Sequence, residues 1–253
     1  MIFSTEKDFR ESAKLSVLNY IREDKSMHQF QTLLFDADNT LFDFTACERA
    51  ALELAFKHRG YPIDDEKRKI YEQINVGLWK KYEQGLMDRK TVIYSRFGLL
   101  FRELGIEDDG IDFEDVYQDL LGQQHVIIPE APEVIDYLYR KYNLYIVTNG
   151  VTATQLRRLK DSKIDQYMQK IFVSEETGYQ KPMKEYFDYC FHRIPQFDPE
   201  KALIIGDSLS SDIKGGNNAG IKTCWYNPGK ESNTLDLSID YEINNLKELY
   251  EFL

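Results

Sequence analysis

Residues 32–40 read Thr-Leu-Leu-Phe-Asp-Ala-Asp-Asn-Thr, a short apolar run that ends in two aspartates two positions apart. The apolar run predicts a buried strand, and the turn-forming residues after it predict that the strand opens into a loop. Asp36 and Asp38 would then point into one pocket. Like charges this close are tolerated only with a cation or a proton between them. We therefore expect a metal site at the end of this strand.

Further short apolar runs indicate how this first strand is embedded. They predict strands at residues 144–147, 171–173, 202–205 and 222–226. Amphipathic helical segments separate them, and strands separated in this way imply right-handed crossovers and a parallel sheet. The strand at 32–35 joins the same sheet. The sequence thus predicts an α/β fold with a Rossmann-like parallel sheet at its core.

A helical insertion follows the first strand. Four helices are predicted at residues 45–58, 65–84, 89–104 and 113–124. Gly60, Gly85 and Gly105 stand at the predicted helix ends, where a residue with left-handed backbone commonly terminates a helix. We interpret 44–126 as a four-helix domain inserted into an α/β core formed by 29–43 and 127–253. Residues 1–28 form an N-terminal extension, in which one helical face carries Phe9, Ala13, Val17, Tyr20 and Ile21.

Composition narrows the possible partners. The 253 residues carry 43 acidic and 32 basic side chains, a formal charge of -11, which argues against binding nucleic acid or an anionic membrane surface. Cys47, Cys190 and Cys224 are far apart in sequence, which favours neither a disulfide framework nor a cysteine-rich zinc site. No apolar stretch approaches the roughly 20 residues of a membrane span. We expect a cytoplasmic protein that acts on small molecules; its oligomeric state is not indicated.

Four polar clusters follow the predicted strands. Taken singly, each can be a set of turn or cap residues. In a parallel sheet, however, the carboxyl ends of the strands open into one crevice, so the clusters converge there. They are Asp36, Asp38 and Thr40; Thr148, Asn149 and Gly150; Lys181 and Pro182; and Asp207, Ser208 and Asp212.

In this order the clusters resemble the four motifs of the haloacid dehalogenase superfamily, whose phosphohydrolases use an aspartate nucleophile. DADNTLFDF is similar to the first motif, TNG to the second, the lysine of YQKP to the third and GDSLSSD to the fourth. The helical insertion has the place and size of the family's C1-type cap. The segments LWKKYEQG, SEETGYQKP and GDSLSSDIKGGNNAGIKTCWYN resemble the pyrimidine 5′-nucleotidase branch.

The resemblance implies Mg²⁺-dependent hydrolysis of a phosphomonoester through an aspartyl-phosphate. Asp36 would be the nucleophile, and Asp38 would protonate the leaving oxygen and later deprotonate water. The phosphoryl group would be bound by Thr148, the amides of Asn149 and Gly150, and Lys181. The metal ligands would be Asp36, Asp207, Asp212 and the backbone carbonyl of Asp38. The second aspartate favours phosphate over halide, because a departing halide needs no proton.

Substrate choice is expected to lie in the inserted helices. The candidates for stacking on or hydrogen bonding to a pyrimidine nucleoside 5′-monophosphate are Phe42, Phe44, Trp79, Tyr82, Arg96 and Phe97. Aromatic side chains at helical spacing more commonly belong to a core. Two alternatives stay open: a sugar-phosphate phosphatase or phosphomutase on the same fold, and a non-enzymatic phosphoacceptor. Receiver domains, which are such phosphoacceptors, are about half this length and carry no inserted helical cap.

Overall fold

The computed structural model describes residues 29–253. The expected apolar face between Phe9 and Ile21 therefore lies outside the described residues. Within the described range, no helix combines the length and the apolar character that crossing a membrane requires.

One six-stranded sheet forms the centre of the fold, and every neighbouring pair of strands is parallel. The strands follow the spatial order β3-β2-β1-β4-β5-β6. Their bounds are β1 (Thr32–Phe35), β2 (Asn143–Thr148), β3 (Lys170–Val173), β4 (Ala202–Gly206), β5 (Lys222–Tyr226) and β6 (Tyr241–Ile243). The predicted α/β class and the first five strands are confirmed. The sequence analysis missed β6, because this edge strand is three residues long and has an exposed glutamate at its middle position.

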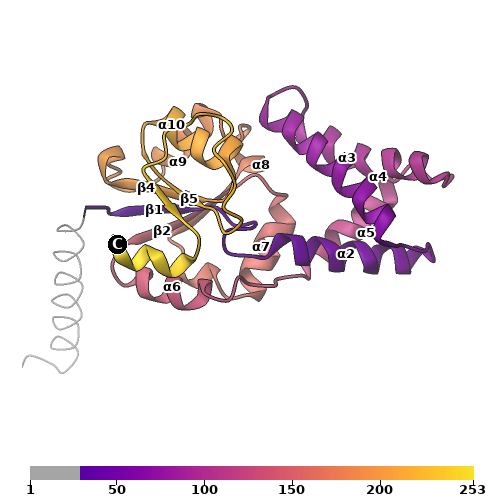
Figure 1. Ribbon diagram of the computed structural model, residues 1–253, viewed down its shortest axis with the longest axis horizontal. Helices are drawn as coiled ribbons and strands as arrows, with labels where there is room; N and C mark the ends of the chain where they lie inside the picture. Colours follow the sequence, from indigo (N-terminus) through magenta and orange to yellow (C-terminus); the bar gives the residue numbers. More distant parts are fainter. Residues whose placement is uncertain (1–28) are drawn as a thin grey trace, which may run out of the picture.

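Alternation along β1 explains why helices cover both faces of the sheet. Leu33 and Phe35 pack in a cluster with α6 (Ala131–Tyr139) and η4 (Leu246–Glu251). Leu34 points to the opposite face and packs in a second cluster with α9 (Lys184–Phe191). Figure 1 shows α9 and α10 on one side of the sheet and α6 on the other. A fully buried parallel sheet of this kind accounts for the uninterrupted apolar run in β1.

The remaining helical segments of the core are short and connect the strands. They are α7 (Thr152–Asp161), η1 (Asp165–Tyr167), α8 (Ser174–Thr177), η2 (Pro199–Lys201), η3 (Leu209–Ile213) and α10 (Lys214–Ala219). Of these, α7 begins directly after β2, and η3 is a π-helical turn that follows β4. Both positions lie at the carboxyl ends of strands, so these two elements border the predicted crevice.

Four helices occupy the insertion: α2 (Phe44–Arg59), α3 (Asp65–Glu83), α4 (Arg89–Leu104) and α5 (Ile111–Gly122). Their ends lie within two residues of the predicted ones. Asp43, Asp64 and Asp88 cap the amino ends of α2, α3 and α4. Gly60 and Gly105 adopt left-handed backbone (φ 72° and 66°) at the carboxyl ends of α2 and α4. Figure 1 shows these helices, here called the cap, grouped beyond the carboxyl ends of the strands.

The cap has its own hydrophobic core and contacts the α/β core at several places, two of which lie on opposite sides. At one place its two connections run side by side, with Asp43 N–H donating to the Val126 carbonyl at 3.0 Å. At the other, Tyr82 Oη lies 3.2 Å from Ser174 Oγ, and Arg89 forms a 2.8 Å ion pair with Glu175. The crevice at the strand ends therefore lies beneath a cap that is held on both sides.

Candidate active site

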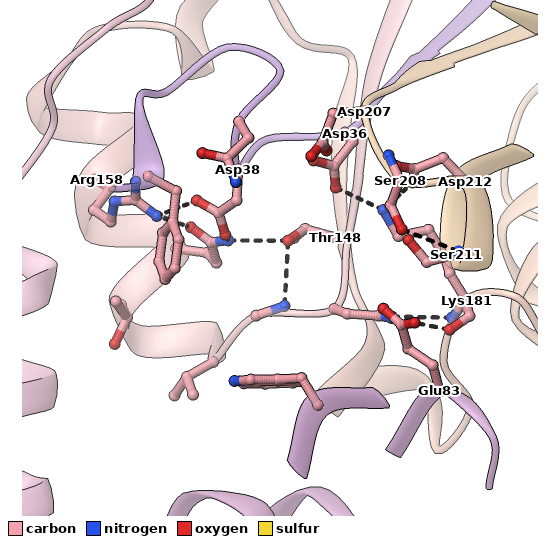
Figure 2. A pocket seen from close by; sticks show the side chains of 18 of the residues that line it. Asp36, Asp38, Glu83, Thr148, Arg158, Lys181, Asp207, Ser208, Ser211 and Asp212 are labelled. Carbon is pink, nitrogen blue, oxygen red and sulfur yellow. Dashed lines mark hydrogen bonds and ion pairs between the residues drawn. The ribbon is translucent and has the colours of Figure 1, made fainter. Parts of the chain in front are cut away.

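Neighbouring strands deliver the polar clusters to one place. Asp36 follows β1, Thr148 ends β2 and Asp207 follows β4, and β1 lies between the other two strands. Lys181 comes from the loop between α8 and α9. Figure 2 shows these side chains around one pocket, with Asp36 close to Asp207 and Asp38 on the other side. The parallel topology thus brings together residues that are far apart in sequence.

Lys181 is the buried cation at the centre of the site. Its ammonium donates to Asp36 Oδ1 at 2.6 Å, to Asp212 Oδ1 at 2.6 Å and to the Val147 carbonyl at 2.8 Å. These three acceptors use all three N–H donors of a lysine. The structure therefore places Lys181 on the carboxylates, where it offsets their charge. Burial lowers the pKa of Lys181, but the two carboxylates outweigh that effect and the net shift is upward.

The carboxylates around Lys181 are crowded. Burial is the main cause that raises the pKa of Asp36 to about 7; the charges of Asp212 and Asp38 add to it, and the charge of Lys181 opposes it. The pKa of Asp207 is also raised, mainly by burial and then by the charges of Asp36 and Asp212. One lysine is thus too little positive charge for the acidic groups assembled here. A bound cation would supply the remainder.

Three of these carboxylates can hold a metal ion. One oxygen each from Asp36, Asp207 and Asp212 lies within 4.8 Å of the others. A purely oxygen donor set on a small cluster suits Mg²⁺, which retains waters and needs few protein carboxylates. The donor chemistry therefore fits the metal that the sequence analysis expected.

Local backbone structure returns Asp212 to this cluster. The π-helical turn η3 curls the chain after Asp207, and the Ser208 N–H donates to Asp212 Oδ2 at 3.1 Å. Gly206 leaves the space that the Asp212 carboxylate occupies, because a Cβ at position 206 would lie 2.3 Å from it. The loop therefore curls enough for Asp207 and Asp212 to face one site, and Gly206 provides the space for this arrangement.

The TNG motif serves two structural purposes. The Asn149 side chain forms reciprocal 2.9 Å hydrogen bonds with the backbone of Lys181, so it fixes the loop that carries the lysine. Thr148 Oγ1 accepts hydrogen bonds from Gly150 N at 3.2 Å and from Gln155 Nε2 at 2.9 Å. A hydroxyl that accepts twice has its hydrogen free to donate elsewhere. Thr148 can therefore donate to an anion in the pocket.

Asp38 is held by two residues that the sequence analysis missed. Arg158 Nη1 donates to Asp38 Oδ1 at 2.5 Å, and Gln155 Nε2 donates to Asp38 Oδ2 at 2.5 Å. Both come from α7, three positions apart on one helix face, and both are buried. The sequence offered a signal, namely two polar residues on the inner face of the helix that follows the TNG motif.

A cavity of about 210 Å³ lies among these groups, and the cap supplies part of its wall. Trp79, Glu83 and Arg96 line it from the cap side. A larger neighbouring cavity of about 960 Å³ shares Phe44, Trp79 and Glu83 with it. The acidic centre therefore opens toward a roomier compartment bounded by aromatic side chains.

The structure corrects two of the expected substrate contacts. Phe42 is fully buried in the core of the sheet, and Phe97 is fully buried in the core of the cap. Neither lines the cavity. Phe97 stacks on Tyr71 with ring centroids 5.3 Å apart, and Phe42 packs within the apolar cluster on one face of the sheet. Packing, rather than substrate binding, accounts for both side chains.

The other four expected substrate contacts fall into two groups: side chains that are available in the cavity and side chains that are engaged by other protein groups. Trp79 and Phe44 line the cavity, as a stacking role requires. Arg96 also lines it, but its guanidinium is paired with Glu114 through 2.7 and 2.5 Å hydrogen bonds. Tyr82 is buried and contacts Ser174. Arg96 is therefore committed mainly to the cap interior.

Comparisons with known proteins agree with this geometry. Residues 33–226 match the haloacid dehalogenase-like hydrolase family. The HAD-hydrolase YfnB of Bacillus subtilis is 48% identical over 90% of this chain and 97% of its own. Its crystal structure, described as bound to magnesium and revealing interdomain movement, aligns with a TM-score of 0.85 over 88% of this chain and 98% of that one.

Two further relatives carry a defined activity in their names. Pyrimidine 5′-nucleotidase PynA of Streptococcus pneumoniae is 38% identical over 88% of this chain and 95% of its own. Pyrimidine 5′-nucleotidase YjjG of Escherichia coli is 28% identical over 87% of this chain and 96% of its own. The family match spans both the α/β core and the inserted helices. This chain is therefore a member of the haloacid dehalogenase-like hydrolase family.

Proposed function

We propose that the protein is a Mg²⁺-dependent phosphomonoester hydrolase that works through an aspartyl-phosphate on Asp36. The observation that carries the proposal is the placement of Asp36, which contacts Lys181 and lies within the acidic triad. Thr148 and Asp38 line the same cavity. A phosphomonoester is an anion, so its cleavage depends on charge neutralisation and in-line positioning more than on a strong nucleophile.

The residues divide the reaction into two balanced steps. In the first, an Asp36 oxygen bonds to phosphorus, the ester P–O bond breaks, and Asp38 gives its proton to the leaving oxygen. In the second, Asp38 takes a proton from water, the water oxygen bonds to phosphorus, and the Asp36–phosphorus bond breaks. Lys181 keeps the Asp36 side chain oriented throughout, and Thr148 donates to a phosphoryl oxygen. A bound Mg²⁺ supplies charge neutralisation of the phosphoryl group.

We propose pyrimidine nucleoside 5′-monophosphates as the preferred substrates. The supporting observations are the two relatives named as pyrimidine 5′-nucleotidases and the larger compartment beside the acidic centre. Trp79 and Phe44 line both compartments, so a base could stack there while the phosphate reaches Asp36. A substrate enclosed in this way is a small phosphomonoester.

Phosphate release from a panel of substrates tests the proposal. Purified protein with Mg²⁺ is offered pyrimidine and purine nucleoside monophosphates and several sugar phosphates, and kcat/KM is compared. We expect the highest values for uridine and thymidine 5′-monophosphates. A clear preference for a sugar phosphate would overturn the nucleotidase assignment and leave the phosphatase chemistry standing. Transfer between positions of a bisphosphorylated sugar, without net phosphate release, would identify a mutase.

A further inference from the structure

Gln155 links three groups of the site into one hydrogen-bonded unit. Its Nε2 donates both to Asp38 Oδ2 and to Thr148 Oγ1, and its Oε1 accepts from Arg158 Nη1 at 3.0 Å. The amide orientation follows from these partners, because exchanging oxygen and nitrogen would set acceptor against acceptor. Gly150 makes room for this side chain, since a Cβ there would lie 2.5 Å from Gln155 Nε2.

Arg158 contacts Asp38 from the protein interior. The Arg158 side chain is 1% exposed, whereas the Asp38 side chain is 25% exposed and lines the cavity. Both α7 residues also border the cavity, yet part of the Asp38 carboxylate stays exposed to it beside them. Each carboxylate oxygen can accept more than one hydrogen bond, so Asp38 can still exchange a proton with a group in the cavity. Figure 2 shows Asp38 between Arg158 and Thr148.

The same arginine also contacts both connections between core and cap. Its Nε donates to the Gln124 carbonyl at 3.0 Å, in the connection that returns from α5. Its guanidinium carbon lies 4.5 Å from the ring centroid of Phe42 and 5.5 Å from that of Phe44, at the connection that enters α2. One buried side chain therefore joins Asp38 to both connecting segments.

We propose that Gln155 and Arg158 are positioning residues that hold the Asp38 carboxyl for proton transfer and tie its orientation to the two cap connections. The inference rests on the proposed function, because it requires Asp38 to be the acid and base. Both side chains border the cavity, but the hydrogen bonds described above go to protein groups, and neither residue belongs to the four sequence motifs. Their contribution is geometric, since proton transfer requires the carboxyl to lie within hydrogen-bond reach of the leaving oxygen.

The test compares two substrates that differ in their need for an acid. A nucleoside monophosphate releases an alkoxide that must be protonated, whereas p-nitrophenyl phosphate releases a stable phenolate. For Arg158→Lys, Arg158→Gln and Gln155→Leu we expect kcat/KM on uridine monophosphate to fall by about 10- to 100-fold. We expect kcat/KM on p-nitrophenyl phosphate to fall by less than about threefold, because its first step needs no proton.

For p-nitrophenyl phosphate, the substitutions should affect kcat and kcat/KM differently. Hydrolysis of the aspartyl-phosphate needs Asp38 as a base whatever group has left, so kcat should fall for this substrate too. A lower kcat at unchanged kcat/KM means that KM falls in parallel. Misfolding or loss of active sites would lower kcat and kcat/KM together and leave KM unchanged. Arg158→Lys, which keeps the charge and one donor, should retain more activity than Arg158→Gln.

Arg157 provides the matched control. It precedes Arg158 on α7 and pairs with Asp119 of the cap at 2.8 Å, but it is 44% exposed and does not line the cavity. Arg157→Gln should leave both substrates within about twofold of the wild type, since an exposed ion pair contributes little. Circular dichroism melting establishes that each variant is folded. Gln155→Leu, which removes no charge, tests the proposal if both Arg158 variants fail to fold.

Asp38→Asn separates failure of the inference from failure of the proposed function. Suppose that Asp38→Asn lowers kcat/KM much more on uridine monophosphate than on p-nitrophenyl phosphate. If folded Arg158 and Gln155 variants then lower kcat/KM equally on both substrates, the positioning role is wrong. If Asp38→Asn itself lowers kcat/KM equally on both substrates, Asp38 is not the acid. That result overturns both the proposed catalytic role of Asp38 and the positioning role. The inference is supported if variants of Asp38, Gln155 and Arg158 all lose more kcat/KM on uridine monophosphate than on p-nitrophenyl phosphate. The control Arg157→Gln should stay near the wild type on both.

Discussion

Asp36 and Asp38 stand two positions apart, yet their surroundings differ. Asp36 lies against Lys181 inside a cluster of buried carboxylates, and burial raises its pKa to about 7. Asp38 lies between a buried amide and a buried guanidinium, with its remaining surface toward the cavity. Asp36 belongs to the candidate metal cluster, whereas Asp38 lies outside that cluster and lines the cavity. This division is what a nucleophile and an acid/base pair require.

Substitution of either aspartate should therefore have a different kinetic result. Asp36→Asn should abolish turnover, because an amide oxygen cannot form the aspartyl-phosphate. Asp38→Asn should slow turnover by a factor of about 10² to 10⁴, the usual loss for a general acid. Phosphate release from uridine monophosphate is the measurement. Near wild-type turnover by Asp36→Asn would refute the mechanism.

Two glycines make a matched pair for testing the metal site. Gly206→Ala should weaken Mg²⁺ binding by at least about tenfold, because its Cβ would collide with the Asp212 carboxylate. Gly77→Ala, inside α3 and with nothing within 4 Å of the added Cβ, should raise stability by about 0.5–1 kcal/mol and leave Mg²⁺ binding unchanged. Titration of Mg²⁺ against melting temperature reports both effects. Unchanged binding in a folded Gly206→Ala protein would show that Asp212 is not a ligand.

At the scale of elements, a buried ion pair joins α4 to α5. Arg96 is 2% exposed and Glu114 is fully buried, and two hydrogen bonds connect them. The Arg96 guanidinium also lies 4.7 Å from the ring centroid of Tyr117. The pair lies inside the cap, where the packed aromatic rings exclude water. These contacts hold together α4 and α5, which contribute Arg96, Gln118 and Leu121 to the cavity lining.

Breaking this pair from one side should be costly. Glu114→Gln should lower the free energy of unfolding of the cap by about 3–5 kcal/mol, because it leaves the buried Arg96 charge with neutral partners. Urea unfolding measures the change. The control is Asp136→Asn on α6, whose partner Arg140 is 71% exposed, and its effect should stay below about 0.5 kcal/mol. Equal effects of the two substitutions would contradict a special role for the cap pair.

At the scale of the whole molecule, the acidic centre couples stability to pH. The folded pKa of Asp36, about 7, lies above its ordinary value of 3.8, so between these values the folded state binds the proton more tightly. Metal-free stability should therefore be higher below this window and should fall as pH rises through it. Mg²⁺ binds the ionised carboxylates and opposes that loss.

We accordingly expect saturating Mg²⁺ to raise the melting temperature more at pH 8 than at pH 5.5. In Asp36→Asn, the metal-free melting temperature should fall less between these two pH values than in the wild type, because one raised carboxyl is absent. Calorimetry supplies four melting temperatures for the wild type, without and with Mg²⁺ at each pH, and two metal-free ones for Asp36→Asn. An Mg²⁺ effect that is larger at pH 5.5 would contradict the assignment of Asp36 to the metal site.

The N-terminal segment gives a second test at this scale. All candidate site residues lie within 29–253, and β1 begins at Thr32. A protein shortened to begin at Met27 should therefore keep its turnover number on uridine monophosphate. Loss of turnover by a folded, shortened protein would show that the segment contributes to the site.

The sequence by itself determined five of the six strands, the cap helices and the four motifs, because these depend on local patterns. Apolar runs of three to five residues and capping aspartates and glycines act within a few positions of each other, so β1 and α4 could be predicted to the residue. The order of the motifs along the chain also predicted their meeting at the strand ends, since parallel strands share one carboxyl edge.

Only the tertiary structure decided which side chains hold the motif residues. Arg158 reaches Asp38 across 120 positions, and no local periodicity specifies such a contact. Burial likewise decided that Phe42 and Phe97 pack in cores while Trp79 faces the cavity, although all three are aromatic. The physical reason is that a side chain's role depends on which distant groups fold against it. Hydrophobic packing and buried charge pairing settle that choice once the whole chain is assembled.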